Sequence, residues 1–357
     1  MITAGIIGAT GYVGAELVRI LLRHPNIKKI VLSSVSYEGQ FMHDIYPNFR
    51  EQLEPKCDPV LHNADFIMEH SDIIFTALPH GLAENYAFEA KKKGQKLIDL
   101  SADFRFGEDE ETFVKWYKNP WKHRDIHLEA VYGLPEINRA EIKSADVIGN
   151  PGCYVTASTL GLMPAIKSAI VKTDYIIADC KSGITGAGRE PSATNNFSEA
   201  GESFSAYAVG GHRHQPEIAR NLSELAGKNV DVIFTPHLLP MSRGILATLY
   251  APLNDDFIAN TAIEQRAEVV QKLYEDAYKD EQFVRVLPKG IVPKTKNVRG
   301  TNMCDMSIHI VNNGKMLQII SVIDNMVKGA SGQAVQNMNL MYGFEEAAGL
   351  DLVPAAF

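Results

Sequence analysis

One cysteine of this sequence lies where a thiol could act as a nucleophile. Cys153 follows the run Gly149-Asn150-Pro151-Gly152 and begins a helix that we expect to extend to about Ala169. The N–H groups at the start of a helix, together with its dipole, stabilise a thiolate. A thiolate is the nucleophile that acyl transfer requires, so we predict this role for Cys153. The remaining thiols are typical of small buried apolar residues: Cys57, Cys180 and Cys304.

A thiolate nucleophile needs a base, and the segment Gly211-His212-Arg213-His214-Gln215-Pro216-Glu217 offers one. Proline is favoured at the first position of a helix, so we expect a helix from Pro216 to about Leu225. Glu217 then lies in its first turn, where the carboxylate could orient the imidazole of His214. We predict that His214 is the catalytic acid or base and that Glu217 supports it. The alternative is a helix start with solvated polar residues.

Other polar residues are candidates for contacts with an anionic substrate. His212 and Arg213 share the loop before His214, and we predict that both contact the substrate. Arg105 ends the run Leu100–Arg105 after an apolar strand, at the edge where open α/β sheets bind ligands, and could clamp a phosphate or carboxylate. Asn150, or backbone N–H groups near it, could stabilise a tetrahedral oxyanion. We expect no bound metal.

Three glycines near the N-terminus predict a dinucleotide site. The run Gly8-Ala9-Thr10-Gly11-Tyr12-Val13-Gly14 separates an apolar strand over 2–7 from a helix over 15–22. Such a turn brings backbone close to a pyrophosphate at a helix N-terminus. Glycines that serve packing alone are the alternative. We predict cofactor contacts from Gly8, Thr10, Gly11, Tyr12, Val13 and Gly14.

The end of the second strand favours NADP(H) over NAD(H). An acidic residue expected there would bind the adenosine 2′-hydroxyl and repel a 2′-phosphate. The sequence instead runs Leu32-Ser33-Ser34-Val35-Ser36, and hydroxyls accommodate a phosphate. A second Gly-rich run, Lys181–Arg189, follows a strand and is typical of an anion-binding loop. Further predicted cofactor contacts are Ser34, Ser36, Pro79, Ser182 and Gly183.

These residues require two kinds of scaffold. Up to about residue 150, strands over 2–7, 29–33, 73–77, 96–100 and 146–148 alternate with helices, which predicts a doubly wound parallel sheet of Rossmann type. Beyond it, long apolar strands with fewer helices predict an α+β catalytic domain with a mixed sheet. We expect a dinucleotide-binding domain over 1–150, completed by 327–357, and a catalytic, substrate and oligomerisation domain over 151–326.

Composition excludes several classes of partner. The chain has 357 residues, with 35 Lys and Arg against 43 Asp and Glu, so its net charge is -8 and no basic run suits nucleic acid or an anionic membrane. No apolar run approaches the ~18–20 residues of a membrane helix. Four cysteines without CxxC spacing favour a reducing compartment. We therefore expect a soluble cytoplasmic protein with a small-molecule substrate.

The motifs together resemble a known family. In this order, the sequence carries the glycine turn, the Leu100–Arg105 run, Gly149–Tyr154, Gly211–Glu217 and Thr235–Met241, followed by Thr295–Asn302 and Asp324–Gln333. This set is similar to the N-acetyl-gamma-glutamyl-phosphate reductases of arginine biosynthesis and spans nearly the whole chain. The resemblance implies a fold similar to aspartate-semialdehyde and glyceraldehyde-3-phosphate dehydrogenases, and a homo-oligomer, either a dimer or a tetramer.

The resemblance also implies a reaction, the NADPH-dependent reduction of an N-acetylated glutamyl 5-phosphate to its semialdehyde through a cysteine thioester. Cys153 matches the family nucleophile, His214 best matches the acid/base, and Asn325 with Gly329 matches the segment that returns to the cofactor. Many members have Arg where Val35 follows Ser34. Alternatives are the same chemistry on N-acetylaminoadipyl phosphate or aspartyl phosphate, and a catalytically silent NADP-binding regulator.

Overall fold

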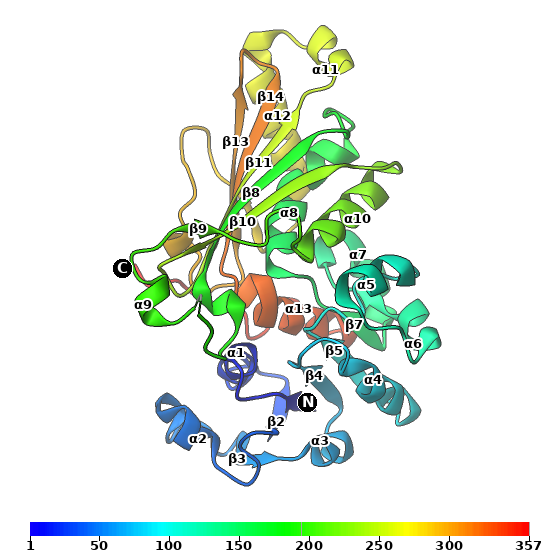
Figure 1. Ribbon diagram of the computed structural model, residues 1–357, viewed down its shortest axis with the longest axis vertical. Coiled ribbons are helices and arrows are strands. Elements are labelled where there is room, and N and C mark those ends of the chain that lie inside the picture. Colours follow the sequence, from blue (N-terminus) through cyan, green and yellow to red (C-terminus); the bar gives the residue numbers. More distant parts are fainter. Residues whose placement is uncertain (194, 357) are drawn as a thin grey trace. The chain divides into compact units, whose positions relative to one another are not determined.

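The computed structural model describes residues 1–193 and 195–356, which form two compact units. The first unit comprises Met1–Pro151 and Ala330–Leu352, and the second comprises Gly152–Gly329 and the residues from Val353 onward. Within the described residues, each unit is built around one seven-stranded sheet (Figure 1).

The sheet of the first unit is entirely parallel. Its strand order is β3-β2-β1-β4-β5-β7-β6, and every neighbouring pair runs in the same direction. The predicted doubly wound Rossmann-type sheet is therefore confirmed. Its strands are β1 (Ile2–Ile7), β2 (Ile27–Ser33), β3 (Cys57–His62), β4 (Ile73–Thr76), β5 (Lys96–Asp99), β6 (Val131–Tyr132) and β7 (Val147–Gly149).

Helices pack on both faces of this sheet because a buried parallel sheet must be covered on each side. One layer contains α1 (Tyr12–Leu21), α7 (Pro135–Ser144) and α13 (Gly332–Met341); the other contains α3 (Ala64–His70), α4 (Ala83–Lys92) and α6 (Arg124–Glu129). The apolar residues of α1 recur at helical spacing and face the core, since Leu17, Val18 and Leu21 are fully buried. The outer segments are α2 (Met42–Ile45), η1 (Pro47–Phe49) and α5 (Glu110–Tyr117).

The second sheet is mixed, as predicted. Its order is β12-β13-β14-β11-β8-β10-β9, with β8 and β10 parallel and β8 and β11 antiparallel. Its strands are β8 (Ile176–Gly183), β9 (Ser205–Ala206), β10 (Val232–Leu239), β11 (Ile245–Pro252), β12 (Val284–Val286), β13 (Cys304–Val311) and β14 (Met316–Ile323).

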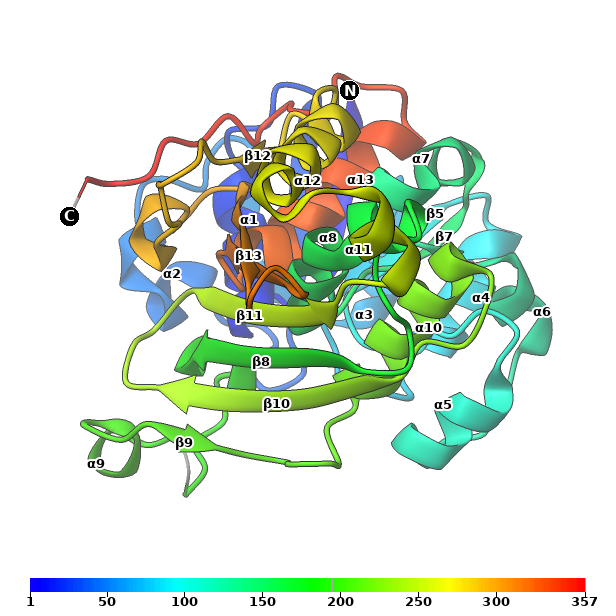
Figure 2. The same ribbon diagram turned by 90° about the horizontal axis from the view of Figure 1, so that it is seen from above.

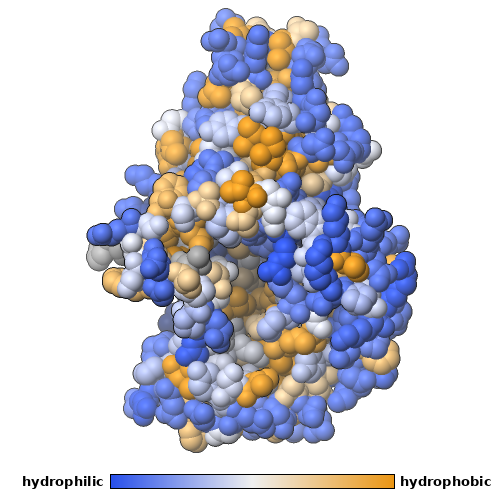
Figure 3. All heavy atoms as spheres, in the orientation of Figure 1, coloured by the Kyte–Doolittle hydropathy of each residue, from blue (hydrophilic) through white to orange (hydrophobic). Residues whose placement is uncertain are grey.

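Three helices cover one face of the second sheet: α8 (Cys153–Lys167), α10 (His214–Ala226) and α12 (Ile263–Tyr278). Figure 2 shows α8 and α10 on the same side of strands β11, β8 and β10. Buried and half-buried residues alternate along β8 and β11, so their opposite face is open. Hydrophobic side chains interrupt the hydrophilic surface over this part of the second unit (Figure 3). Ile233 of β10 is 50% exposed. Shorter elements of this unit are η2 (Ile184–Ala187), α9 (Phe197–Ala200), α11 (Asp255–Asn260) and η3 (Thr295–Asn297). The segment η4 (Val327–Ser331) begins in this unit and ends in the first.

Helix α8 carries Cys153 at its first position and is buried along its length. Pro164 lies inside it and has no N–H to donate to the carbonyl of Leu160, four residues earlier. The hydroxyl of Tyr278 donates to that carbonyl, and the hydroxyl of Tyr274 donates to the carbonyl of Gly161 at 2.8 Å. Both tyrosines come from α12, which therefore anchors the helix beneath the cysteine.

Some elements differ from the sequence expectations. Helix α10 begins at His214 rather than at Pro216, which lies in its first turn, where a missing N–H is tolerated. Strand β8 continues through Ser182 and Gly183, so the expected anion-binding loop begins as sheet and continues as η2. Within the described residues, no helix is both long and apolar enough to cross a membrane.

Candidate active site

The glycine turn after β1 has the geometry that a dinucleotide requires. Gly8 has φ +90°, and a Cβ built on it would lie 2.4 Å from the carbonyl oxygen of Ala77. A Cβ on Gly14 would lie 2.4 Å from the carbonyl oxygen of Gly8. These two positions therefore exclude every side chain, Gly8 for the turn and Gly14 for the packing of α1 against it.

Gly11 differs from both, because a Cβ built on it would make only an ordinary van der Waals contact. The nearest atom to a Cβ built on it is the Gly8 carbonyl oxygen, at 3.5 Å. Gly11 is also the N-cap of α1, and no side chain caps that helix. The first N–H groups of a helix have no partner within it, so this cradle fits a pyrophosphate. Tyr12 and Val13, the first two residues of α1, border it.

The end of β2 is joined to this turn through hydroxyl groups. The Oγ1 of Thr10 lies 2.8 Å from the Oγ of Ser34, and both side chains are buried. Val35 is 89% exposed, and Ser36 beside it is also exposed. Pro79 is exposed in the loop after β4. The structure thus brings the predicted contacts of the first unit to the carboxyl ends of β1, β2 and β4, where parallel sheets bind ligands.

The start of α8 holds Cys153 in a crowded setting. Gly152 is the N-cap, with extended backbone and no side-chain cap. A Cβ built on Gly329 would lie 2.8 Å from the Cβ of Cys153, so Gly329 packs directly against the cysteine. The Cys153 side chain itself is partly exposed. The thiol is thus held at a helix N-terminus and still has access to a reactant.

His214 lies beside this cysteine. A Cβ built on Gly152 would lie 2.6 Å from Nε2 and 2.9 Å from Cε1 of the His214 ring, so the imidazole packs on the residue that precedes Cys153. Glu217 is fully buried, and its Oε1 accepts the N–H of Gly152 at 3.0 Å. Glu217 therefore ties the start of α10 to the start of α8, and the expected cysteine, histidine and glutamate come together.

His212 is held on both ring nitrogens. Its Nδ1 accepts the backbone N–H of His214 at 3.0 Å, and its Nε2 lies 3.3 Å from the hydroxyl of Tyr207. Burial, with Arg213 nearby, lowers the pKa of His212 to about 4. The ring is therefore neutral near pH 7 and engaged within the unit. Arg213, predicted to contact the substrate, has an exposed side chain.

The other cysteines occupy settings that suppress thiolate formation. Burial raises the pKa of Cys180 to about 12 and raises the pKa of Cys57 further. Cys304 is also buried. Of the four thiols, only Cys153 combines a helix N-terminus, partial exposure and a neighbouring imidazole.

Asn150 and Arg105 lie together in the first unit. The Asn150 Nδ2 donates to the carbonyl of Ala330 at 3.1 Å, and its Oδ1 accepts from Asn337 Nδ2 at 3.1 Å. The buried Arg105 donates through Nε to the Asn150 carbonyl at 2.7 Å and through Nη2 to the Leu100 carbonyl at 3.1 Å. These contacts make Arg105 a brace for the loop after β5.

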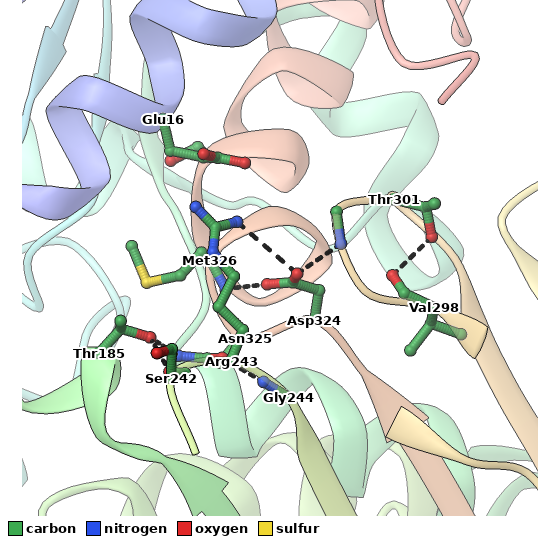
Figure 4. Close-up of polar contacts among 12 residues, drawn as sticks. Glu16, Thr185, Ser242, Arg243, Gly244, Val298, Thr301, Asp324, Asn325 and Met326 are labelled. Carbon is green, nitrogen blue, oxygen red and sulfur yellow. Dashed lines mark hydrogen bonds and ion pairs between the residues drawn. The ribbon is translucent and has the colours of Figure 1, made fainter. Parts of the chain in front are cut away.

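Asn325, predicted to meet the cofactor, uses both ends of its amide within the second unit (Figure 4). Its Oδ1 accepts the N–H of Gly244 at 2.7 Å, and its Nδ2 donates to Thr185 Oγ1 at 3.0 Å. Beside it, the buried Asp324 accepts the N–H of Gly300 at 2.6 Å and pairs with Arg243 at 3.7 Å. This cluster fixes the loop that joins β10 and β11.

Ser182 and Gly183 lie against the same loop. A Cβ on Gly183 would lie 2.6 Å from the Ser242 carbonyl oxygen, and the buried Ser182 donates to the Gly183 carbonyl at 2.9 Å. Sequence reasoning missed Arg243, Asp324 and the tyrosines around His212. Tyr154 follows Cys153 directly, which was a usable signal, whereas Tyr207 has none in its local sequence.

Comparison with known families assigns a model to each unit. A model described as semialdehyde dehydrogenase, NAD binding domain, matches residues 3–145, and one described as semialdehyde dehydrogenase, dimerisation domain, matches residues 153–325. Together they cover most of the chain.

Curated relatives match over the full length. The chain is 50% identical to the N-acetyl-gamma-glutamyl-phosphate reductase of Clostridium beijerinckii, over all of both chains. It is 48% identical to the enzyme of that name from Thermoanaerobacter pseudethanolicus, over 99% of each chain.

Solved structures share the fold. Aspartate semialdehyde dehydrogenase II from Vibrio cholerae has a TM-score of 0.70 at 17% identity, over 96% of this chain and 98% of that one. Aspartate semialdehyde dehydrogenase from Candida albicans, solved with NADP, has a TM-score of 0.68 at 15% identity, over 96% and 99%.

Proposed function

The chain belongs to the N-acetyl-gamma-glutamyl-phosphate reductase family, and we propose that it acts through a thioester on Cys153. It reduces N-acetyl-gamma-glutamyl phosphate to N-acetylglutamate 5-semialdehyde and phosphate, a step of arginine biosynthesis. The single observation that supports Cys153 most is the packing of the His214 ring on Gly152, at the start of the helix that Cys153 begins.

Attack by the Cys153 sulfur on the acyl phosphate carbonyl forms the C–S bond. The carbonyl oxygen becomes an oxyanion, which the N–H groups of the first turn of α8 can stabilise. The C–O bond to phosphate then breaks and leaves a thioester. The side chain of Asn150, which we expected to share the oxyanion role, is occupied by Ala330 and Asn337. We therefore assign that role to the backbone.

His214 handles the proton of this step. Its imidazole accepts the thiol proton as sulfur attacks and passes it to the departing phosphate. Glu217 supports His214 by tying α10 to Gly152 through one hydrogen bond. The exposed Arg213 is our candidate for holding the phosphate group, because Arg105 is buried and donates to two carbonyls.

NADPH, when bound, supplies the hydride that reduces the thioester. The Gly8–Gly14 turn would hold its pyrophosphate, since Gly11 leaves the N-terminus of α1 open. Ser34 and Ser36 would accept the 2′-phosphate at the end of β2, where no carboxylate repels it. The tetrahedral oxyanion formed on Cys153 then collapses, and the aldehyde leaves together with a Cys153 thiolate. His214 returns a proton taken from solvent to the sulfur, which restores the thiol for the next turnover.

We also assign the chain to a cytoplasmic homo-oligomer. The open face of the second sheet, with its alternating half-buried residues and the exposed Ile233, supports self-association through the part of the chain that matches a dimerisation domain. All four cysteines are thiols, which suits a reducing compartment. A dimer through this face is the simplest assembly.

Phosphate-dependent reduction of NADP by N-acetylglutamate 5-semialdehyde tests the proposal. The wild type should be active, and Cys153→Ala should lose at least about four orders of magnitude in kcat while binding NADPH normally. Cys180→Ala is the matched control and should remain active. Residual turnover above about one per cent in Cys153→Ala would remove the nucleophile assignment.

Cofactor and substrate selectivity need separate assays. We expect kcat/KM for NADPH to exceed that for NADH, and equal values would show that Ser34 and Ser36 do not discriminate. N-acetylaminoadipyl phosphate and aspartyl phosphate should be poorer substrates than N-acetyl-gamma-glutamyl phosphate. A methylene is worth about 1–3 kcal/mol in a pocket, so the preference over the longer substrate should be about 10- to 200-fold.

A further inference from the structure

A chain of hydrogen bonds leads away from the base through three aromatic side chains. The backbone N–H of His214 donates to His212 Nδ1 at 3.0 Å, and His212 Nε2 lies 3.3 Å from Tyr207 Oη. Tyr207 Oη donates to Tyr154 Oη at 3.2 Å, and Tyr154 Oη donates to the His237 carbonyl at 3.2 Å. Every partner belongs to the second unit.

The direction of this chain is fixed by its two ends. A backbone N–H can only donate, so His212 Nδ1 carries no proton and the proton of the neutral ring lies on Nε2. A backbone carbonyl can only accept, so the Tyr154 hydroxyl points to His237 and the Tyr207 hydroxyl points to Tyr154. His212 Nε2 therefore donates to Tyr207. Each of the four hydrogen bonds has one consistent donor.

The surroundings keep every member uncharged. The His212 ring is enclosed by Tyr154, Tyr207 and Phe234, with ring centroids 5.2–5.7 Å away. Burial raises the pKa of both tyrosines well above their usual range, so both hydroxyls keep their protons. The titratable groups facing the chain are Arg213, His214, Cys153, Cys180 and the His237 side chain.

We propose that His212, Tyr207 and Tyr154 are positioning residues, which hold the start of α10 so that His214 lies against Gly152 beside Cys153. His212 Nδ1 does for the N–H of His214 what a side-chain cap does at an ordinary helix start. α10 has no side-chain cap from Arg213, its N-cap residue. Tyr207 in turn fixes the ring, and its own N–H donates to the Pro236 carbonyl of β10 at 3.1 Å.

This role replaces the substrate contact that the sequence suggested for His212. A substrate that bound the His212 ring would have to displace a hydrogen-bond partner, because both ring nitrogens already have one. A second proton on Nδ1 would face the N–H of His214 and break the first hydrogen bond, which would release the helix start. The inference rests on the proposed function, because it concerns the placement of His214 toward Cys153.

Two substitutions at His212 separate positioning from substrate contact. Asparagine presents an oxygen that can accept from an N–H two residues on, whereas alanine presents none. His212→Ala should therefore lower kcat about tenfold, the loss typical of a removed cap at a site that needs exact placement. His212→Asn should recover most of that loss. KM for the acyl phosphate should change little in either variant.

Tyr207→Phe tests the second link and needs a spectroscopic readout. In the wild type, nitrogen NMR of labelled histidine should show His212 as the Nε2–H tautomer, neutral down to about pH 5, as its low pKa requires. Tyr207→Phe keeps the hydrogen bond to Nδ1, so the Nε2–H tautomer should persist, but the Nε2 signal should shift because its partner is lost. The fall in kcat should be smaller, about threefold. Tyr175→Phe, at an exposed tyrosine before β8, is the control and should change neither.

The outcomes separate this inference from the proposed function. If the wild type lacks acyl-phosphate reductase activity, the proposed function fails, whereas the tautomer of His212 and the shift of its Nε2 signal in Tyr207→Phe can still be measured. If the wild type is active but both His212 variants raise KM for the acyl phosphate at unchanged kcat, His212 contacts the substrate and the inference is wrong. A His212 that carries its proton on Nδ1, or both protons near neutral pH, would also overturn it.

Discussion

Helices α1 and α8 begin alike, yet we propose different chemistry for their starts. Each has a glycine N-cap with extended backbone, Gly11 at φ -72° and ψ 164°, and Gly152 at φ -67° and ψ 146°, and no side chain caps either helix. A Cβ on Gly11 would fit without a clash, whereas a Cβ on Gly152 would clash with the His214 ring. N–H groups at a helix start that have no partner within the helix can bind any anion. We propose that the residues beside the glycine decide whether that anion is a bound phosphate or a thiolate.

The residues that surround the two helix starts also differ in their distance along the sequence. The turn at α1 is shaped by Gly8 and Gly14, which lie within the same seven residues, and by Ala77. The start of α8 is shaped by His214 and Gly329, some 60 and 175 residues later. Apart from Ala77, the residues that shape the first helix start are local in the sequence, whereas both neighbours of the second come from distant segments.

The largest effect that separates the two helix starts should come from removal of the base. His214→Asn should lower kcat by about 10²–10⁴, the usual contribution of a positioned acid or base, and leave NADPH binding at α1 unchanged. Steady-state kinetics with dinucleotide titration measures both. His70→Asn, at an exposed histidine of α3, is the control. A loss of less than about threefold in kcat for His214→Asn would contradict the assignment of the base.

The next largest effect should come from adding a side chain at Gly152, the glycine that packs against the His214 ring. Gly152→Ala places a methyl group 2.6–2.9 Å from three atoms of the His214 ring, so the imidazole must move. Since a displacement of about 1 Å near a reacting group costs about 10²-fold, kcat should fall by that order while the dinucleotide still binds. Full activity in Gly152→Ala would show that contact between the ring and the start of α8 is not needed.

The two units should also respond to pH in opposite directions. Burial, with Asp103 nearby, raises the pKa of Asp99 to about 6. A pKa raised on folding favours the protonated form, so the stabilisation is complete below about pH 4 and is lost as pH rises through 6. Burial lowers the pKa of His212, so the second unit loses stabilisation as pH falls below about 6.5.

Asp99→Asn tests the first half of this contrast. The variant does not titrate, so its unfolding free energy relative to the wild type should rise by up to about 3 kcal/mol between pH 4 and 7. Denaturant unfolding across that range measures the difference. Asp125→Asn, at an exposed carboxylate of α6, should show no such trend. A pH-independent difference for Asp99→Asn would mean that Asp99 is ionised in the folded protein throughout.

The smallest of these effects should come from the open glycine. Gly11→Ala adds a methyl group whose nearest neighbour is 3.5 Å away, so the fold should be unchanged. The methyl group would occupy the space that a pyrophosphate needs, so the Kd for NADPH should rise about tenfold. Phosphate release by Cys153 without dinucleotide should be unaffected. Unchanged NADPH affinity would place the pyrophosphate elsewhere.

Much of the scaffold could be predicted because its signals are local. Strand β1 covers Ile2–Ile7 as predicted, and α8 begins at Cys153 as predicted. Helix α12 was not predicted from the sequence, because its buried face contains a single aliphatic residue, Val270. The other buried residues of the helix are Arg266, Tyr274 and Tyr278. Strand β3 was not predicted from the sequence, because Asp58 and Pro59 interrupt its apolar pattern.

The site was less predictable than the scaffold. Cys153 and the segment around His214 were evident from residue type and position, but the ring on Gly152 and the Gly152 N–H bound to Glu217 depend on tertiary packing. The links from His212 to Tyr207 and from Tyr207 to Tyr154 join residues up to 53 positions apart, and no short-range pattern encodes them.

The thioester on Cys153 is the central claim, and a dinucleotide-free acylation experiment tests it most directly. Mixing the enzyme with N-acetyl-gamma-glutamyl phosphate in the absence of NADPH should release one phosphate per subunit. Mass spectrometry should then find the N-acetylglutamyl group on the peptide that contains Cys153 and on no other. Cys153→Ala should release no such burst and carry no acyl group. Phosphate released only when NADPH is present, or an acyl group on Cys57, Cys180 or Cys304, would contradict the account.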